Sequence, residues 1–132
     1  MEKIKIAFAT DNGKTFMDRH FGDADFYDIY EISENNADLL KRINNTIEDK
    51  KDVHADPKKA QGITKLPKNE DVQAVVSKIF GPNIKRIKKK FVCIIMDEDT
   101  IDNSLNYLCK NIRLIFKEWK KGEQRRHLVI RK

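Results

Sequence analysis

The chain has 132 residues, of which 36% are charged and 39% are apolar, and its formal net charge at neutral pH is +6. These values fit one folded domain with a solvated surface and exclude a disordered tail. The apolar runs are shorter than the roughly 20 residues that cross a bilayer, and no signal-peptide pattern follows Met1. We therefore expect a cytoplasmic protein with no membrane partner.

Two strands are predicted in the first part of the chain. Residues 3–9 (KIKIAFA) alternate between charged and apolar and then become wholly apolar, and residues 26–32 (FYDIYEI) are rich in aromatic and β-branched side chains. The segment between them holds Asp11-Asn12-Gly13 and Gly22-Asp23, which favour turns because glycine and Asx residues tolerate positive φ. His20 is therefore expected on a loop.

The middle of the chain predicts a hairpin partner, a helix and a short strand. Residues 39–47 (LLKRINNTI) form a strand candidate that would pair with its predecessor. After a polar loop, Asp56-Pro57 predicts the start of a helix that runs to about residue 66. Residues 71–76 (DVQAVV) favour a short apolar strand.

The second half predicts alternating helices and strands. Gly81-Pro82-Asn83 indicates a strand-to-helix turn, followed by a helix over residues 83–90 whose N-terminal amides would favour an anion. Residues 91–96 (FVCIIM) are typical of a buried central strand. Apolar residues at steps of three and four predict a helix from residue 101 to about 121, although a hairpin from Ile112 is an alternative.

A short edge strand over residues 127–130 completes the predicted elements. Three hairpin-connected strands followed by alternating helices and strands predict an α/β fold, with a mixed sheet flanked by helices on both faces.

The only two cysteines, Cys93 and Cys109, show no CxxC spacing. With two cysteines and no CxxC spacing, a disulfide framework or a cysteine-only metal site is not expected. Both thiols are expected to be buried as small apolar groups.

Positive charge is concentrated at the C-terminal end. Residues 110–132 hold nine basic and two acidic side chains and so carry +7, which leaves −1 for the first 109 residues. This charge could attract nucleic acid or an acidic protein, or it could simply form a solvated face. No aromatic residues suited to base stacking accompany it.

The motifs described above resemble those of the dinitrogenase iron-molybdenum cofactor biosynthesis family, which includes NifX-like proteins and the C-terminal domain of NifB-like proteins. The resemblance rests on the strand end Ile6–Asp11, the turn His20-Phe21-Gly22, the aromatic strand that follows it, Gly81-Pro82-Asn83, and His54 before the first predicted helix. It spans about residues 3–109. Where many members carry a glycine-rich HGxGxC-like stretch, this chain has HADPKKA from His54.

The resemblance implies a ribonuclease H-like fold with a mixed five-stranded sheet, over a domain of residues 1–109. Residues 110–132 would then be a basic C-terminal extension packed on the same domain. It also implies a metallocluster-binding or carrier protein, for the iron-molybdenum cofactor or an iron-sulfur cluster precursor, with a cluster donor or acceptor protein as partner. The expected metal ligands are His20 and His54, and the expected contacts are Phe21, Gly22, Gly81, Pro82 and Asn83. The protein would be a monomer or a homodimer.

Several simpler or competing interpretations of these residues remain open. His20 could shape its turn, while His54 and His127 could be surface residues. A nuclease would need carboxylates that converge on paired metal ions, and the candidates are Asp11, Asp28 and Asp97 or Asp99. The sequence holds no GxSxG, P-loop or GxGxxG motif, so we expect a protein that is not an enzyme. The alternative function is an interaction module that binds nucleic acid or an acidic protein through the basic C-terminal helix.

Overall fold

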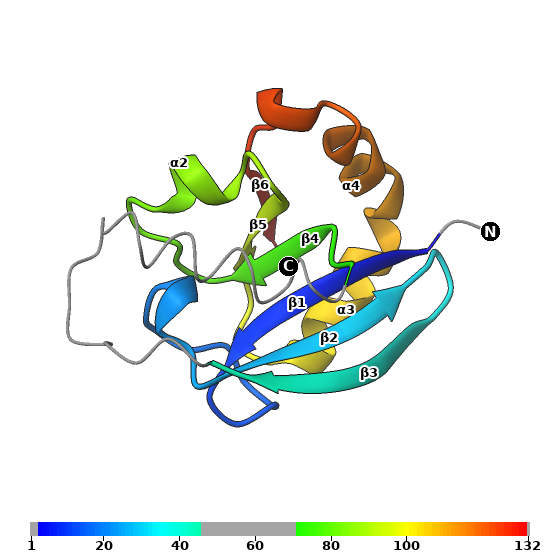
Figure 1. The fold of residues 1–132 in the computed structure, drawn as a ribbon. Helices are drawn as coiled ribbons and strands as arrows, with labels where there is room; N and C mark the ends of the chain where they lie inside the picture. Colours follow the sequence, from blue (N-terminus) through cyan, green and yellow to red (C-terminus); the bar gives the residue numbers. More distant parts are fainter. Residues whose placement is uncertain (1–2, 46–70, 132) are drawn as a thin grey trace.

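The computed structural model describes residues 3–45 and 71–131 (Figure 1). Their central feature is a six-stranded sheet in the order β3-β2-β1-β4-β5-β6. The strands are β1 (Ile4–Thr10), β2 (Phe26–Ile32), β3 (Ala37–Asn44), β4 (Ala74–Ser77), β5 (Val92–Asp97) and β6 (Leu128–Arg131).

The sheet is mixed, as the sequence predicts. β2 runs antiparallel to both β1 and β3, whereas β1, β4, β5 and β6 are mutually parallel. The central strands β1, β4 and β5 are almost wholly buried because helices or loops cover both faces of the sheet there. Since parallel strands end at the same edge, the loops that follow β1, β4 and β5 gather at one end of the molecule.

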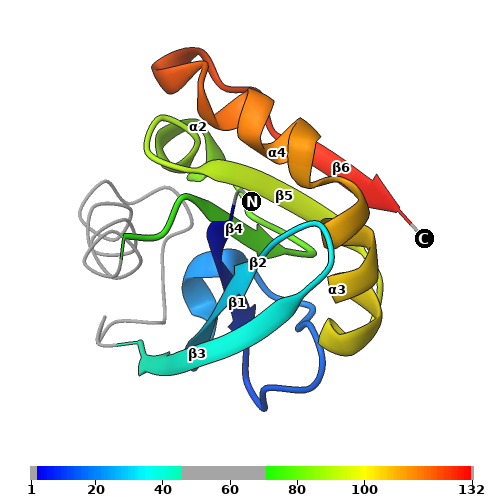
Figure 2. The same ribbon diagram turned by 90° about the vertical axis from the view of Figure 1, so that its right-hand side faces the viewer.

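The helices of the described residues lie on both faces of the sheet. α3 (Ile101–Lys110) and α4 (Ile112–Trp119) cover one face, and the single-turn helix α2 (Ile84–Ile87) lies on the other, as the two ribbon views agree (Figures 1 and 2). Two short 3-10 turns, η1 (Phe21–Asp23) and η2 (Gly122–Gln124), complete the architecture.

Two apolar clusters hold the layers together, one on each face of the sheet. The larger joins alternate side chains of the sheet, such as Ile6 and Ile94, to Leu108 and Ile115 of α3 and α4. The smaller joins the intervening side chains of the strands to Phe21, Phe80, Ile87 and Phe91. The strands β1 to β5 therefore contribute to both cores through their period of two, whereas β6 contributes only to the larger one.

The cysteines lie on opposite sides of the sheet. Cys93 is fully buried in the smaller cluster, and the partly buried Cys109 packs against the larger one. Both thiols are free. The expectation that both are buried is right for Cys93 and wrong for Cys109, which is only partly buried beside α3 and the larger cluster.

Three expectations differ from the structure. The sheet has six strands rather than five, because Leu128–Arg131 pairs with β5. The predicted helix over residues 101–121 is two helices, because the backbone leaves the helical conformation at Asn111 (φ −105°, ψ 15°). The Asn111 side chain and backbone amide both donate to the Tyr107 carbonyl (2.7 and 3.1 Å) at this point. The helix predicted over residues 83–90 shortens to Ile84–Ile87.

The strand predicted over residues 39–47 begins earlier, at Ala37, and ends at Asn44. The helix predicted after Asp56 lies outside the described residues. Within the described part of the chain, no helix has both the length and the apolar composition needed to cross a membrane.

Candidate functional site

The candidate site lies where β1, β4 and β5 end, at Thr10, Ser77 and Asp97. In α/β sheets, ligands bind preferentially beyond the carboxyl ends of the parallel strands. The loops that follow these three strands carry most of the residues that the sequence singles out.

The first of these loops holds the His-Phe-Gly turn and is tied to the segment after β4. His20 forms an isolated parallel bridge with Ile79, and the Phe21 amide donates to the Ile79 carbonyl (2.8 Å). The turn closes on itself because the Asp23 amide donates to the His20 carbonyl (2.9 Å). The His-Phe-Gly turn is thus joined by a backbone hydrogen bond to the segment that leads into Gly81-Pro82-Asn83.

Phe21 and Gly22 support the turn from inside. The Phe21 ring stacks on Phe80 (5.3 Å between centroids) and contacts Tyr27 (5.0 Å). The Tyr27 hydroxyl donates to the Phe21 carbonyl (3.0 Å), and burial raises the pKa of this phenol, so it stays protonated. Asn45 donates to the Gly22 carbonyl (3.0 Å). The buried Phe21 and Gly22 therefore position His20, which is only partly buried.

His20 packs directly against Gly81. A Cβ on Gly81 would lie 2.5 Å from Nδ1 and 2.7 Å from Cε1 of His20, closer than real Cβ contacts allow. Gly81 also has a φ of +71°, which side-chain-bearing residues rarely adopt. The glycine therefore lets the imidazole lie flat against the turn after β4.

The other two residues of the Gly81-Pro82-Asn83 turn differ from each other in burial. Pro82 is exposed, whereas Asn83 is buried at the start of α2 and its Oδ1 accepts no hydrogen bond from residues 3–45 or 71–131. The Ser77 hydroxyl, at the end of β4, is likewise buried and has no hydrogen-bond partner within the described part of the chain. Because α2 is a single turn, its dipole contributes little, and the expected anion-favouring helix end is weaker than the sequence predicts.

Lys78 joins the three loops electrostatically. Its Nζ lies 2.8 Å from Asp99, which follows β5, and 3.6 Å from Asp18, which follows β1. The hydrogen bond to Asp99 raises the pKa of Lys78, so the ammonium stays charged. The site thus carries a cation shared between two exposed carboxylates.

The residues that follow β1 form a compact turn closed by side-chain hydrogen bonds. The sequence analysis predicts a turn there but not these hydrogen bonds. The Thr10 hydroxyl donates to the Thr15 carbonyl (2.8 Å) and accepts from the Gly13 amide (3.0 Å), while Asn12 Oδ1 accepts from the Lys14 amide (2.8 Å). Thr10, directly before Asp11-Asn12-Gly13, is the sequence signal that could have predicted these hydrogen bonds.

The carboxylates proposed for a nuclease do not converge. Asp11 pairs with Arg19, Asp28 pairs with Arg42, and Asp99 pairs with Lys78. Among residues 3–45 and 71–131, no three His, Cys, Asp or Glu side chains are grouped to hold a metal ion. These cation pairs favour structural roles for the carboxylates.

The remaining histidines lie apart from this cluster or outside the described residues. His127 is exposed just before β6, and His54 lies outside the described part of the chain. The structure therefore brings together His20, Phe21, Gly22, Gly81 and Asn83.

Comparisons with known proteins agree with this architecture. The family described as dinitrogenase iron-molybdenum cofactor matches residues 2–111. Among solved structures, a Methanocaldococcus jannaschii protein described as a "putative dinitrogenase" is similar with a TM-score of 0.59 and 23% identity, over 84% of this chain and 92% of that chain. At this identity the similarity concerns the fold. No curated protein matches the chain.

Proposed function

Because the chain belongs to the dinitrogenase iron-molybdenum cofactor family, we propose that it binds and carries a metallocluster, without catalysing a reaction. The cargo would be the iron-molybdenum cofactor or an iron-sulfur precursor, exchanged with a donor or acceptor protein. The observation that carries this proposal is the packing of His20 on Gly81, which joins the two motifs shared with the family at one end of the sheet. The proposal includes the ribonuclease H-like arrangement that the resemblance implies.

His20 is the proposed ligand within the described residues, and His54 is proposed as a second. Imidazole nitrogen is a borderline donor that suits iron. Iron-sulfur clusters are usually held by several thiolates, whereas Cys93 is buried in the smaller cluster behind this region. A donor set with few protein ligands would hold a cluster weakly, which suits a carrier that must release its cargo.

The surroundings of His20 would supply shape and charge. Gly81, Pro82 and Asn83 would form the surface beside the imidazole, and Phe21 and Gly22 would fix its loop. Lys78 would offset part of the negative charge of a cluster, because its ammonium lies between the loops that follow β1 and β5.

The test is anaerobic incubation of the apo-protein with an iron-sulfur cluster donor, followed by visible absorption and iron analysis. We expect stoichiometric iron on the wild type and loss of most of it in the His20→Ala, His54→Ala double variant. His127→Ala is the matched control, because this imidazole is exposed and distant in sequence from the site motifs. A wild type that binds no iron would contradict the proposal.

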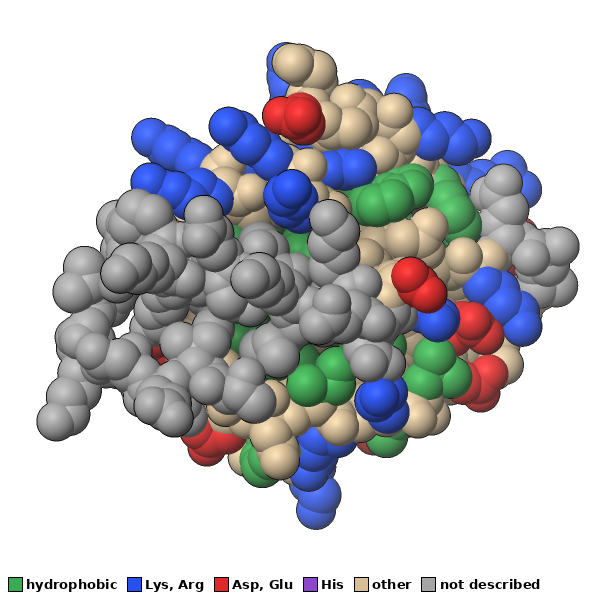
Figure 3. Space-filling view, in the orientation of Figure 1, with side chains coloured by type: hydrophobic (Ala, Val, Ile, Leu, Met, Phe, Trp, Pro, Cys, Tyr) green, Lys and Arg blue, Asp and Glu red, His purple; other side chains and the backbone are tan. Residues whose placement is uncertain are grey.

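A second candidate function rests on a basic ridge, which we define as residues 85–90 and 110–131. Arg125 connects its two parts by donating to the carbonyls of Lys88 (3.5 Å) and Lys89 (2.9 Å). Lys and Arg side chains gather along the upper edge of the molecule, over α2 and α4 (Figure 3). Binding of nucleic acid there would weaken steeply between about 50 and 200 mM salt, whereas cluster binding would not.

A further inference from the structure

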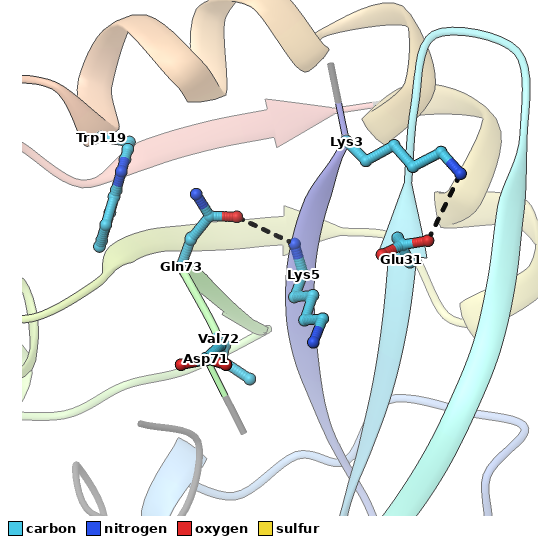
Figure 4. A pocket seen from close by; sticks show the side chains of 7 residues that line it. All are labelled: Lys3, Lys5, Glu31, Asp71, Val72, Gln73 and Trp119. Atoms are coloured by element: carbon cyan, nitrogen blue, oxygen red, sulfur yellow. Dashed lines mark hydrogen bonds and ion pairs between the residues drawn. The ribbon is translucent and has the colours of Figure 1, made fainter. Parts of the chain in front are cut away.

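A hollow lies at the end of the sheet opposite the candidate site, beside the amino ends of β1 and β4. It is a cavity of about 490 Å³ (Figure 4), within the range of about 300 to 1,000 Å³ that small-molecule sites occupy. Its side chains come from Lys3 just before β1, from β1 and β2, from the segment before β4 and from the end of α4. The length of β1 separates it from His20, so it is independent of the cluster proposal.

One wall of this cavity is an aromatic ring held in place. The Arg125 guanidinium carbon lies 4.3 Å from the centroid of the Trp119 ring, and Arg125 Nε donates to the Trp119 carbonyl (3.1 Å). Figure 4 shows the indole edge-on, with one face turned toward Gln73. A ring fixed in advance offers a stacking surface at little ordering cost.

Gln73 presents a hydrogen-bond donor to the same space. Its Oε1 accepts from the Lys5 backbone amide (3.3 Å), and because a backbone N–H only donates, this contact fixes which end of the carboxamide is oxygen. Nε2 makes no hydrogen bond within the described residues, and in Figure 4 it points toward Trp119.

The charges around the cavity leave one cation and one anion available. Lys3 pairs with Glu31 (3.6 Å), whereas Lys5 Nζ and the Asp71 carboxylate have no ion-pair partner among residues 3–45 and 71–131. Figure 4 shows the ends of the Lys5 and Asp71 side chains on the same side of the cavity. A purely anionic ligand would meet Asp71, and a purely cationic one would meet Lys5. A zwitterion complements both charges.

We propose that this cavity binds a free amino acid with an aromatic side chain. Its carboxylate would lie on Lys5 Nζ, its ammonium on the Asp71 carboxylate, and its ring against the face of Trp119. Gln73, whose Nε2 is directed away from Lys5 Nζ, would line the part of the cavity that the ring occupies.

The test uses the intrinsic fluorescence of the intact apo-protein, because Trp119 is the only tryptophan in the chain. The probe is L-phenylalanine, and the two matched analogues are 3-phenylpropionate, which lacks the ammonium, and phenethylamine, which lacks the carboxylate. We expect a saturable fluorescence change with L-phenylalanine and binding at least about tenfold weaker for each analogue.

Two charge-removing variants, Lys5→Gln and Asp71→Asn, should each weaken binding by about tenfold or more. Asparagine suits position 71 because it tolerates the φ of +61° found there. Lys110→Gln on α3 is the control, with the same loss of charge at an exposed position outside the cavity. The proposal is overturned if fluorescence does not saturate up to about 10 mM probe. It is equally overturned if 3-phenylpropionate binds as tightly as L-phenylalanine, or if both cavity variants bind like the wild type.

Discussion

The imidazole of His20 lies so close to Gly81 that no side chain fits between the loops following β1 and β4. A Cβ at position 81 would come within 2.5 to 2.9 Å of three imidazole atoms. The motif at residues 20–22 and the turn at residues 81–83 therefore constrain each other sterically. Any ligand that contacts His20 depends on this glycine for the orientation of the ring.

Substitution of Gly81 by alanine should destabilise the fold and displace His20. The alanine would be forced into a φ of +71°, which costs about 1 to 2 kcal/mol, and it would also overlap the imidazole. We expect the free energy of unfolding to fall by about 2 to 4 kcal/mol in denaturant titrations, because overpacking adds a further cost.

Gly122→Ala is the matched control for this variant. Gly122 has a φ of +62°, but an added Cβ there would meet no atom within 4 Å, so only the conformational cost of about 1 kcal/mol should remain. His20→Ala in the Gly81→Ala background should restore part of the loss. Equal losses at the two glycines would show that His20 does not clash.

Loss of Arg42 should leave a buried carboxylate without its counter-ion. Asp28 is 1% exposed and receives Arg42 Nε at 2.8 Å and Nη2 at 3.2 Å. Breaking a fully buried pair costs about 3 to 5 kcal/mol, but the Arg42 side chain remains 44% exposed. We therefore expect Arg42→Ala to lower the free energy of unfolding by about 2 kcal/mol.

The control for Arg42 is Arg113→Ala. The Arg113 guanidinium lies 3.9 Å from Glu34 with both side chains largely exposed, and such surface pairs contribute at most about 1 kcal/mol. Equal losses of unfolding free energy in the two variants would contradict this prediction. They would mean that water solvates Asp28 once Arg42 is removed.

Glu118 should make stability depend on pH. Burial alone would raise the pKa of this carboxyl, but the Arg126 amide (2.8 Å) and Lys121 (3.0 Å) outweigh burial and lower it. A lowered folded-state pKa stabilises the protein above the unfolded value of about 4.3, and that contribution disappears as pH falls through the folded value.

The measurement compares urea unfolding of the wild type and Glu118→Gln at neutral and acidic pH. The variant should be less stable at pH 7, and the difference should shrink as pH falls below about 4. Glu123→Gln, at an exposed position in η2, should show no such trend. If the stability difference between the wild type and Glu118→Gln stayed unchanged at acidic pH, the effect would come from packing and not from the charge of the carboxylate.

The sequence predicted the fold well where the pattern was local. The aromatic and β-branched side chains of residues 26–32 and the apolar run at 91–96 identified β2 and β5 to within one residue at each end. The helix break at Asn111 was missed because apolar spacing continues through it, while the break itself is a change of backbone conformation at one residue.

The contacts within the candidate site depend on pairing between distant segments of the chain. His20 and Gly81 were singled out separately, yet their packing depends on the parallel pairing of β1 with β4, which joins residues far apart in the chain. The cation that links the loops, Lys78, carries no motif and becomes visible only when Asp18 and Asp99 converge on it. Pairing between distant segments is what single-sequence patterns cannot supply.

The two cysteines should differ sharply in reactivity, which bears on how a cluster could be held. Burial raises the pKa of the Cys93 thiol, and its side chain is fully enclosed. Burial also raises the pKa of the partly exposed Cys109. Since the thiolate is the reactive form, we expect a thiol reagent to modify Cys109 slowly in the native protein and Cys93 only after unfolding.

Cys109→Ser separates these thiols and also tests the proposed ligand set. The variant should show no reactive thiol when native and one when unfolded, against two in the unfolded wild type. Because Cys109 packs against the α3 and α4 face, away from His20, its loss should leave the amount of iron bound unchanged. Loss of bound iron in Cys109→Ser would instead make sulfur the ligand and contradict the assignment of His20.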